Sequence, residues 1–155
     1  MRNIVNVGYD STNYYVIETA TTKLLVDIGF PGTLPKLNHA LKRTGITLSA
    51  ITYLLITHYH PDHAGLAQEL KHQGIQLIVL EPQLAAIPQL ARFMKPQYRY
   101  QEITLTDTVT LSLAQSRTFL QQIGIVGEVL ATPGHSDDSV TLVLDAGIAF
   151  IECQQ

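Results

Sequence analysis

The first part of the chain alternates short apolar runs with polar breaks, and the spacing of its apolar positions changes from strand-like to helical. Residues 4–7, 13–19 and 23–27 are rich in β-branched and aromatic side chains, which predicts three strands of a small antiparallel meander. Leucines then recur at helical spacing over residues 34–43, and Gly45 follows as a stop signal. The pattern predicts a meander followed by an amphipathic surface helix.

A nearly continuous apolar run at residues 50–56 has the length of a strand and is typical of a strand buried on both faces. Residues 64–73 place apolar side chains on one helical face, Gly74 ends that helix, and residues 75–80 predict the next strand. The polar segment 57–63 lies between the run and the helix. We therefore expect it at the carboxyl edge of a sheet, where the sites of α/β proteins tend to lie.

The second half of the chain has a less regular pattern. Apolar positions at helical intervals predict a helix over residues 82–94 despite Pro88, and residues 98–105 predict a loop that leads into a strand. The remaining expected elements are a strand at 109–111, a helix at 114–123, a strand at 129–132, and a hairpin of 140–144 and 148–151. Strands that alternate with helices predict a single α/β (α+β) domain over residues 1–155, with helices covering sheet faces.

The composition narrows the class of protein. Apolar residues make up 46% of the 155 residues and charged residues only 15%, which suits one domain with a core and excludes a disordered chain. A formal net charge of −3 gives no electrostatic reason to expect nucleic acid as a partner. No apolar run approaches the ~20 residues of a membrane span, and the single Cys153 forms no internal disulfide. We expect a cytoplasmic protein that acts on a small-molecule substrate and binds neither nucleic acid nor membrane.

The segment 57–63 concentrates metal-binding side chains, namely His58, His60, Asp62 and His63. Neutral imidazole is a good zinc ligand, and a catalytic zinc usually takes three protein ligands and leaves one position for water. Because one residue separates His58 from His60, both side chains can point the same way in an extended loop. A polar loop whose histidines only cap a strand and a helix is the alternative, but four such residues in so short a segment favour a metal site. Zinc is the leading metal, with iron and manganese as alternatives.

The segment 57–65 is similar to the His-x-His-x-Asp-His signature of the metallo-β-lactamase superfamily. Segments 24–29 (Leu-Leu-Val-Asp-Ile-Gly) and 132–136 (Thr-Pro-Gly-His-Ser) match two more landmarks of that family in the expected order, so the resemblance covers nearly the whole chain. It implies a four-layer αβ/βα sandwich with the metals in a groove between the sheet edges.

The resemblance also implies a set of site residues. His58, His60 and His135 would form the first zinc site, and Asp62 and His63 would face a second metal. Asp27 would lie nearby and orient ligands through its carboxylate.

The sequence departs from the family pattern near its last residues. The family places an aspartate that bridges the two metals where this sequence has Cys153, preceded by Glu152, and it continues to a further metal-binding histidine beyond the position of Gln155. We therefore expect a chain shortened in its second half that holds one zinc, with a second metal lacking its bridge unless Cys153 or Glu152 substitutes. The missing elements would expose a sheet edge and an apolar face, which predicts a homodimer.

Two functions follow as hypotheses. The first is a metal-dependent hydrolase in which water activated by zinc attacks an ester, thioester, lactone or amide, with Asp62 as the catalytic residue that orients or deprotonates the water. The second is a degenerate member of the family that keeps the fold and at most one metal and serves as a binding or structural module.

Other polar residues have simpler interpretations. We interpret His39 and His72 as surface residues on helices, and Ser136 as a residue that supports its loop through local hydrogen bonds. Asp137 and Asp138 are expected to be a solvated or helix-capping pair rather than metal ligands. Finally, a cluster in the middle of the chain either lines a substrate groove or forms an exposed loop, and the exposed loop is preferred: Lys95, Tyr98, Arg99 and Tyr100.

Overall fold

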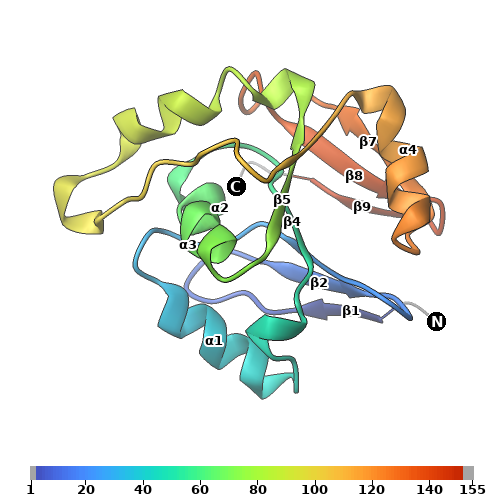
Figure 1. Cartoon of the computed structure of the whole chain (residues 1–155), viewed down its shortest axis with the longest axis horizontal. Coiled ribbons are helices and arrows are strands. Elements are labelled where there is room, and N and C mark those ends of the chain that lie inside the picture. Colours follow the sequence, from blue (N-terminus) through green and yellow to red (C-terminus); the bar gives the residue numbers. More distant parts are fainter. Residues whose placement is uncertain (1–2, 152–155) are drawn as a thin grey trace.

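The computed structural model describes residues 3–151, so Glu152 and Cys153 lie outside the described residues. Two sheets make up its framework (Figure 1). The larger one has six strands in the order β1-β2-β3-β4-β5-β6, and the smaller one has three in the order β7-β8-β9. Helices and two sheets together confirm the predicted α/β class.

The large sheet begins as an antiparallel meander and continues with parallel strands. The meander consists of β1 (Asn3–Asn6), β2 (Tyr15–Glu18) and β3 (Lys23–Val26), and it confirms the three strands expected from the sequence. The strands β4 (Tyr53–Leu55), β5 (Gln76–Leu80) and β6 (Val109–Leu111) then add in parallel.

The register of β3 on β4 decides where the polar loops meet. Val26 pairs with Leu55, and the amide of Asp27 donates to the carbonyl of Leu55 at 2.9 Å. Since the carboxyl ends of parallel neighbours lie at one edge of a sheet, the segments after Val26 and after Leu55 leave the sheet side by side. The expected edge location of segment 57–63 is therefore confirmed.

Helices cover the outer face of the large sheet. They are α1 (Leu34–Arg43), α2 (Pro61–Ala64) and α3 (Ala67–His72), and they bury apolar side chains such as Leu37, Leu41 and Leu70 against β-strand residues in one core. No helix among residues 3–151 is long and apolar enough to cross a bilayer.

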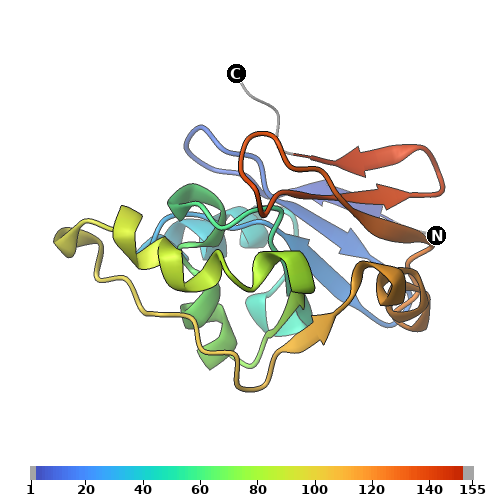
Figure 2. The same cartoon turned by 90° about the horizontal axis from the view of Figure 1, so that it is seen from above.

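The small sheet packs on the other face of the large one (Figure 2). Its strands are β7 (Gly127–Ala131), β8 (Val140–Leu144) and β9 (Ile148–Phe150). A second core fills the space between the sheets, with Leu142 and Leu144 of β8 packed in one cluster with Leu24 and Leu55 of the large sheet. Helix α4 (Leu113–Gln122) joins this core through Leu120, and a capping box between Ser112 and Gln115 starts the helix.

Short 3₁₀ helices fill the long connections and account for the main errors of the sequence prediction. They are η1 (Leu48–Ala50), η2 (Glu81–Gln83), η3 (Ile87–Phe93) and η4 (Pro96–Tyr98). The single helix predicted over residues 82–94 is wrong, because prolines at the starts of η2 and η3 interrupt α-helical hydrogen bonding. The loop predicted at 98–105 is confirmed from residue 99 onward, and it leads through a turn at 106–107 into β6. The helix predicted at 64–73 is shorter, because α2 ends at Ala64 and α3 covers only 67–72.

Candidate metal centre

The first two histidines lie in a bent segment that follows β4, in which the amide of His60 donates to the carbonyl of His58 at 3.1 Å. His58 is 0% exposed and His60 is partly exposed, with backbone angles of −102° and 158° at the start of α2. Their ring centroids lie 4.5 Å apart. The two imidazoles therefore lie together, as predicted, although the backbone between them turns rather than extends.

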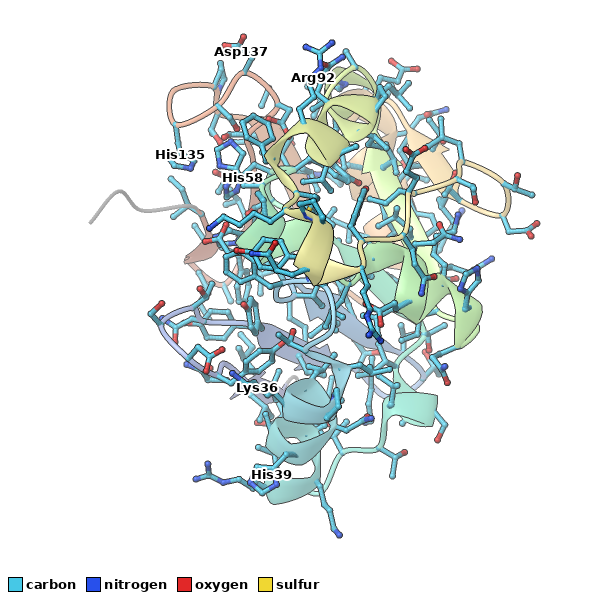
Figure 3. All side chains as sticks on the ribbon, turned by 90° about the vertical axis from the view of Figure 1, so that its left-hand side faces the viewer. Lys36, His39, His58, Arg92, His135 and Asp137 are labelled. Carbon is cyan, nitrogen blue, oxygen red and sulfur yellow. The ribbon has the colours of Figure 1, made fainter. Side chains whose placement is uncertain are left out.

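The third histidine arrives from the small sheet. His135 lies in the loop between β7 and β8, and that loop is joined to segment 57–63 because the amide of Val140 donates to the carbonyl of Thr57 at 2.8 Å. Nε2 of His135 lies 3.2 Å from Nδ1 of His60, and its ring centroid lies 4.7 Å from that of His58. One ring nitrogen from each of the three histidines lies within 4.8 Å of the others. Figure 3 shows His58 and His135 at one end of the molecule, with His39 at the opposite end.

The surroundings of the buried His58 ring suit a metal ligand. The pKa of His58 is lowered to about 2, mainly by burial, and the nearby imidazoles of His63, His60 and His135 contribute in the same direction. His58 is therefore a neutral imidazole, and the lone pair of a ring nitrogen can bind a metal. Its Nδ1 lies 3.3 Å from the hydroxyl of Thr57, whereas its buried Nε2 has no hydrogen-bond partner among residues 3–151.

The three histidines therefore fit a zinc ion. A buried nitrogen without a partner is costly, and coordination removes that cost because the lone pair is then used. Two nitrogens on one tetrahedral zinc lie roughly 3.3 Å apart at ordinary Zn–N distances, close to the 3.2 Å between His60 and His135. One ring nitrogen from each of His58, His60 and His135 is thus placed where the three can together hold such an ion.

Asp27 orients the metal-binding segment from the neighbouring strand. Its backbone has a φ of 60°, a left-handed conformation that aspartate tolerates better than most residues. Its carboxylate accepts the amide and the hydroxyl of Thr57, each at 2.7 Å, and lies 3.1 Å from Nδ1 of His63. Asp27 thus contacts the residues that flank the ligands rather than the ligand cluster itself, as the resemblance implied.

Asp62 and His63 lie beside the three histidines. The ring centroid of His63 is 4.4 Å from that of His58, and its Nε2 lies 3.5 Å from the carboxylate of Asp62, whose side chain is 40% exposed. Among residues 3–151, the one group of ligand atoms that all lie within 4.8 Å of one another consists of the three histidines. Ligation of a second metal by Asp62 and His63 stays a prediction.

Sequence reasoning missed the role of Asp138. The expectation of a solvated acidic pair is wrong for this residue, which is 7% exposed and accepts the amide of Tyr59 at 2.7 Å. Asp137 is exposed, as expected, and Ser136 forms local hydrogen bonds with Ser139, as predicted. A buried backbone amide needs an acceptor, but the sequence does not reveal which distant residue supplies it.

A second missed residue is Phe93. Its side chain on η3 is 57% exposed although its ring centroid lies 5.8 Å from that of His60. The signal in the sequence was an aromatic residue between two cations in a proline-rich stretch, which alone did not indicate proximity to the histidines.

The fold of the chain is similar to that of solved metallo-beta-lactamases. Native FEZ-1 metallo-beta-lactamase from Legionella gormanii superimposes with a TM-score of 0.74 at 23% sequence identity, over 96% of this chain and 58% of that one. The family model of the metallo-beta-lactamase superfamily matches residues 7–148. The chain belongs to that superfamily.

Two curated relatives are similar in sequence to this member of the superfamily. One is the lactamase-like protein notP of Aspergillus sp. (strain MF297-2), 29% identical over 86% of this chain and 35% of the relative. The other is the atrochrysone carboxyl ACP thioesterase of Passalora fulva, 28% identical over 88% of this chain and 34% of the relative. The chain spans about a third of the length of these relatives.

Proposed function

We propose that this protein is a zinc-dependent hydrolase of small-molecule esters or thioesters. The observation that supports the proposal is that ring nitrogens of His58, His60 and His135, which come from two separate loops, lie close together. The ring of His58 is neutral, and its buried Nε2 has no hydrogen-bond partner among residues 3–151. Three histidines that leave one coordination position open are typical of catalytic rather than structural zinc. Lactones and amides undergo the same attack and are the next candidates.

The residues around the three histidines have distinct roles in this proposal. When bound, zinc supplies a Lewis acid that acidifies water and polarises a carbonyl oxygen. Asp62, partly exposed beside His63, accepts a proton from the attacking water as the water oxygen bonds to the acyl carbon. The bond to the leaving oxygen or sulfur then breaks, and the same proton passes to that atom, so the products are a carboxylic acid and an alcohol or thiol.

Among these bonds, a thioester is favoured by one relative. The Passalora fulva protein matches 88% of this chain and is described as an acyl carrier protein thioesterase. Because that match covers 34% of the relative, the likeness supports the bond type and no particular substrate.

Elemental analysis and hydrolysis assays test the proposal together. We expect one zinc per purified chain, and hydrolysis of chromogenic esters and thioesters that is lost in His58→Ala and His60→Ala. His39→Ala is the matched control, because His39 lies on α1 at the opposite end of the molecule (Figure 3). Absence of zinc, together with absence of any hydrolysis sensitive to the first two substitutions, would refute the hydrolase.

The departure at Cys153 and Glu152 favours a second candidate function. With no aspartate at the bridging place, the protein would serve as a binding module that holds at most one metal. Zinc bound at one per chain, with no turnover of any substrate in the panel, would support this function instead.

A further inference from the structure

One segment beside the metal centre has a composition unlike the rest of the chain. We call residues 84–100, which contain η3 and η4, the arm, and Figure 1 shows its yellow part projecting from the body of the molecule. No acidic residue occurs between Glu81 and Glu102, whereas Arg92, Lys95 and Arg99 lie within the arm. A chain with a formal net charge of −3 thus carries a purely cationic segment at this place.

These cations are available to a ligand. Across residues 3–151 the ion pairs of lysine and arginine side chains involve Lys23, Lys36 and Arg117, and none involves the arm. Lys95 places its ammonium 6.0 Å from the ring centroid of Tyr98. Arg92 lies at the end of the molecule that also holds His58 and His135 (Figure 3).

Aromatic side chains connect the arm to the metal centre. Phe93 packs 5.8 Å from His60, and Tyr98 lies 5.7 Å from Phe30, measured between ring centroids. Phe30 follows Asp27 by three residues, and the amide of Ile28 donates to the carbonyl of His63 at 3.1 Å, so this loop is fixed to the histidine segment. The arm therefore contacts the surroundings of the site at two separate points.

Aromatic side chains exposed next to this site indicate which kind of ligand the arm binds. Phe93 is 57% exposed and Phe30 is 39% exposed, although aromatic rings gain most from burial. Cations beside an apolar surface favour a ligand that is apolar along its chain and anionic at one end.

From these contacts, and resting on the proposed hydrolase, we infer that the arm selects anionic amphiphilic substrates. The apolar chain of the ester or thioester lies against Phe93 and Phe30, and its carboxylate or phosphate pairs with Lys95 and Arg92. The arm thus determines specificity, while the histidines and Asp62 carry the reaction.

A binding measurement tests the arm without any turnover. The chain contains no tryptophan, so Phe93→Trp introduces a single fluorescent reporter. Octanoate, octyl phosphate and octyltrimethylammonium share one apolar chain and differ in the charged group. We expect the two anions to bind at least tenfold more tightly than the cation, and the stronger of the two identifies carboxylate or phosphate as the preferred group.

Charge-reversal variants locate the effect on the arm. In the Phe93→Trp background, Arg92→Glu combined with Lys95→Glu should weaken anion binding at least tenfold. Lys42→Glu is the matched control, since Lys42 is an exposed lysine in the last turn of α1, outside the arm, and it should leave the affinity unchanged. Equal affinity for anion and cation, or equal weakening by Lys42→Glu, would overturn the inference.

Hydrolysis rates distinguish the inference from the proposed function. The mono-p-nitrophenyl ester of adipic acid and p-nitrophenyl hexanoate present acyl chains of equal length, with and without a terminal carboxylate. We expect kcat/KM to favour the adipate ester about tenfold in the wild type and the preference to vanish in Arg92→Gln/Lys95→Gln. Equal rates for both esters refute the role of the arm. If neither ester is hydrolysed, the zinc analysis and the wider substrate panel decide on the hydrolase, and the tryptophan titration decides on the arm.

Discussion

Replacement of Asp138 tests whether the metal-binding segment is held in place by the protein rather than by the metal. The carboxylate of Asp138 is buried and accepts the amide of Tyr59 at 2.7 Å, between the ligands His58 and His60. Hydrogen bonds to charged groups contribute about 1.5–3 kcal/mol, and a buried amide left without an acceptor costs a similar amount. For Asp138→Ala we therefore expect the free energy of unfolding to fall by about 3 kcal/mol.

The assay is urea denaturation of the metal-free protein followed by circular dichroism, together with zinc affinity from competition with a chelating indicator. A loss of that size corresponds to a decrease in Tm of about 6–12 °C for a chain of this length. Asp138→Asn keeps an acceptor oxygen and should lose only about 1 kcal/mol. Zinc affinity should fall about tenfold in Asp138→Ala, as is found when residues that orient ligands are removed.

Asp137→Ala is the matched control, because Asp137 is the exposed neighbour in the same loop. It should change neither stability nor zinc affinity measurably. If Asp138→Ala behaved like Asp137→Ala, or if the alanine and asparagine variants at 138 were equally unstable, the hydrogen bond to Tyr59 would not be what holds the segment.

Three further predictions concern the metal, the pH and the surface. Zinc at a thousand times its Kd should stabilise the folded protein by about 4 kcal/mol, or a Tm increase of about 8–16 °C in differential scanning fluorimetry; His60→Ala should abolish most of this increase, and a full increase in that variant would contradict the site. The folded-state pKa of His58 is lowered to about 2 from a reference value of 6.5, so below pH 6.5 the unfolded chain binds a proton that the folded, metal-free chain does not. Stability should therefore be highest above that pH and fall toward pH 5 by up to about 1.4 kcal/mol per pH unit, and urea denaturation of His58→Gln should show a shallower decrease. Leu130 and Ile148 on the small sheet are 43% and 41% exposed; we expect concentration-dependent dimers in sedimentation velocity that Leu130→Lys weakens and Leu105→Lys does not, and a monomer at every concentration would exclude this interface.

Local patterns sufficed for most of the fold. The helix at 34–43 has the bounds that its leucine spacing predicted, and the strand at 140–144 matches to the residue. The prediction failed where prolines interrupt a helical spacing of apolar residues. The apolar positions over 82–94 suggested an α-helix, but the prolines in this segment favour two short 3₁₀ helices. The pairing of the strands depends on contacts between distant residues, and no local pattern contains those contacts.

The residues of the candidate site also fall into those that the sequence predicted and those that depend on distant contacts. The spacing of His58 and His60 predicted one shared direction, and the family resemblance supplied His135, which the structure places beside them. Asp138 and Phe93 were missed because their importance depends on which residue they meet, Tyr59 in one case and His60 in the other. Both contacts join segments that are tens of residues apart, so composition and spacing give no signal for them.

Two buried carboxylates hold the backbone of the metal-binding segment at positions next to its ligands. Asp27, after β3, accepts the amide of Thr57, and Asp138, before β8, accepts the amide of Tyr59. Thr57 and Tyr59 are the residues directly before the ligands His58 and His60. Each carboxylate thus fixes a backbone position next to a ligand without occupying a ligand position. Because Asp27 belongs to the large sheet and Asp138 precedes the small one, the geometry of the three histidines depends on the packing between the two sheets.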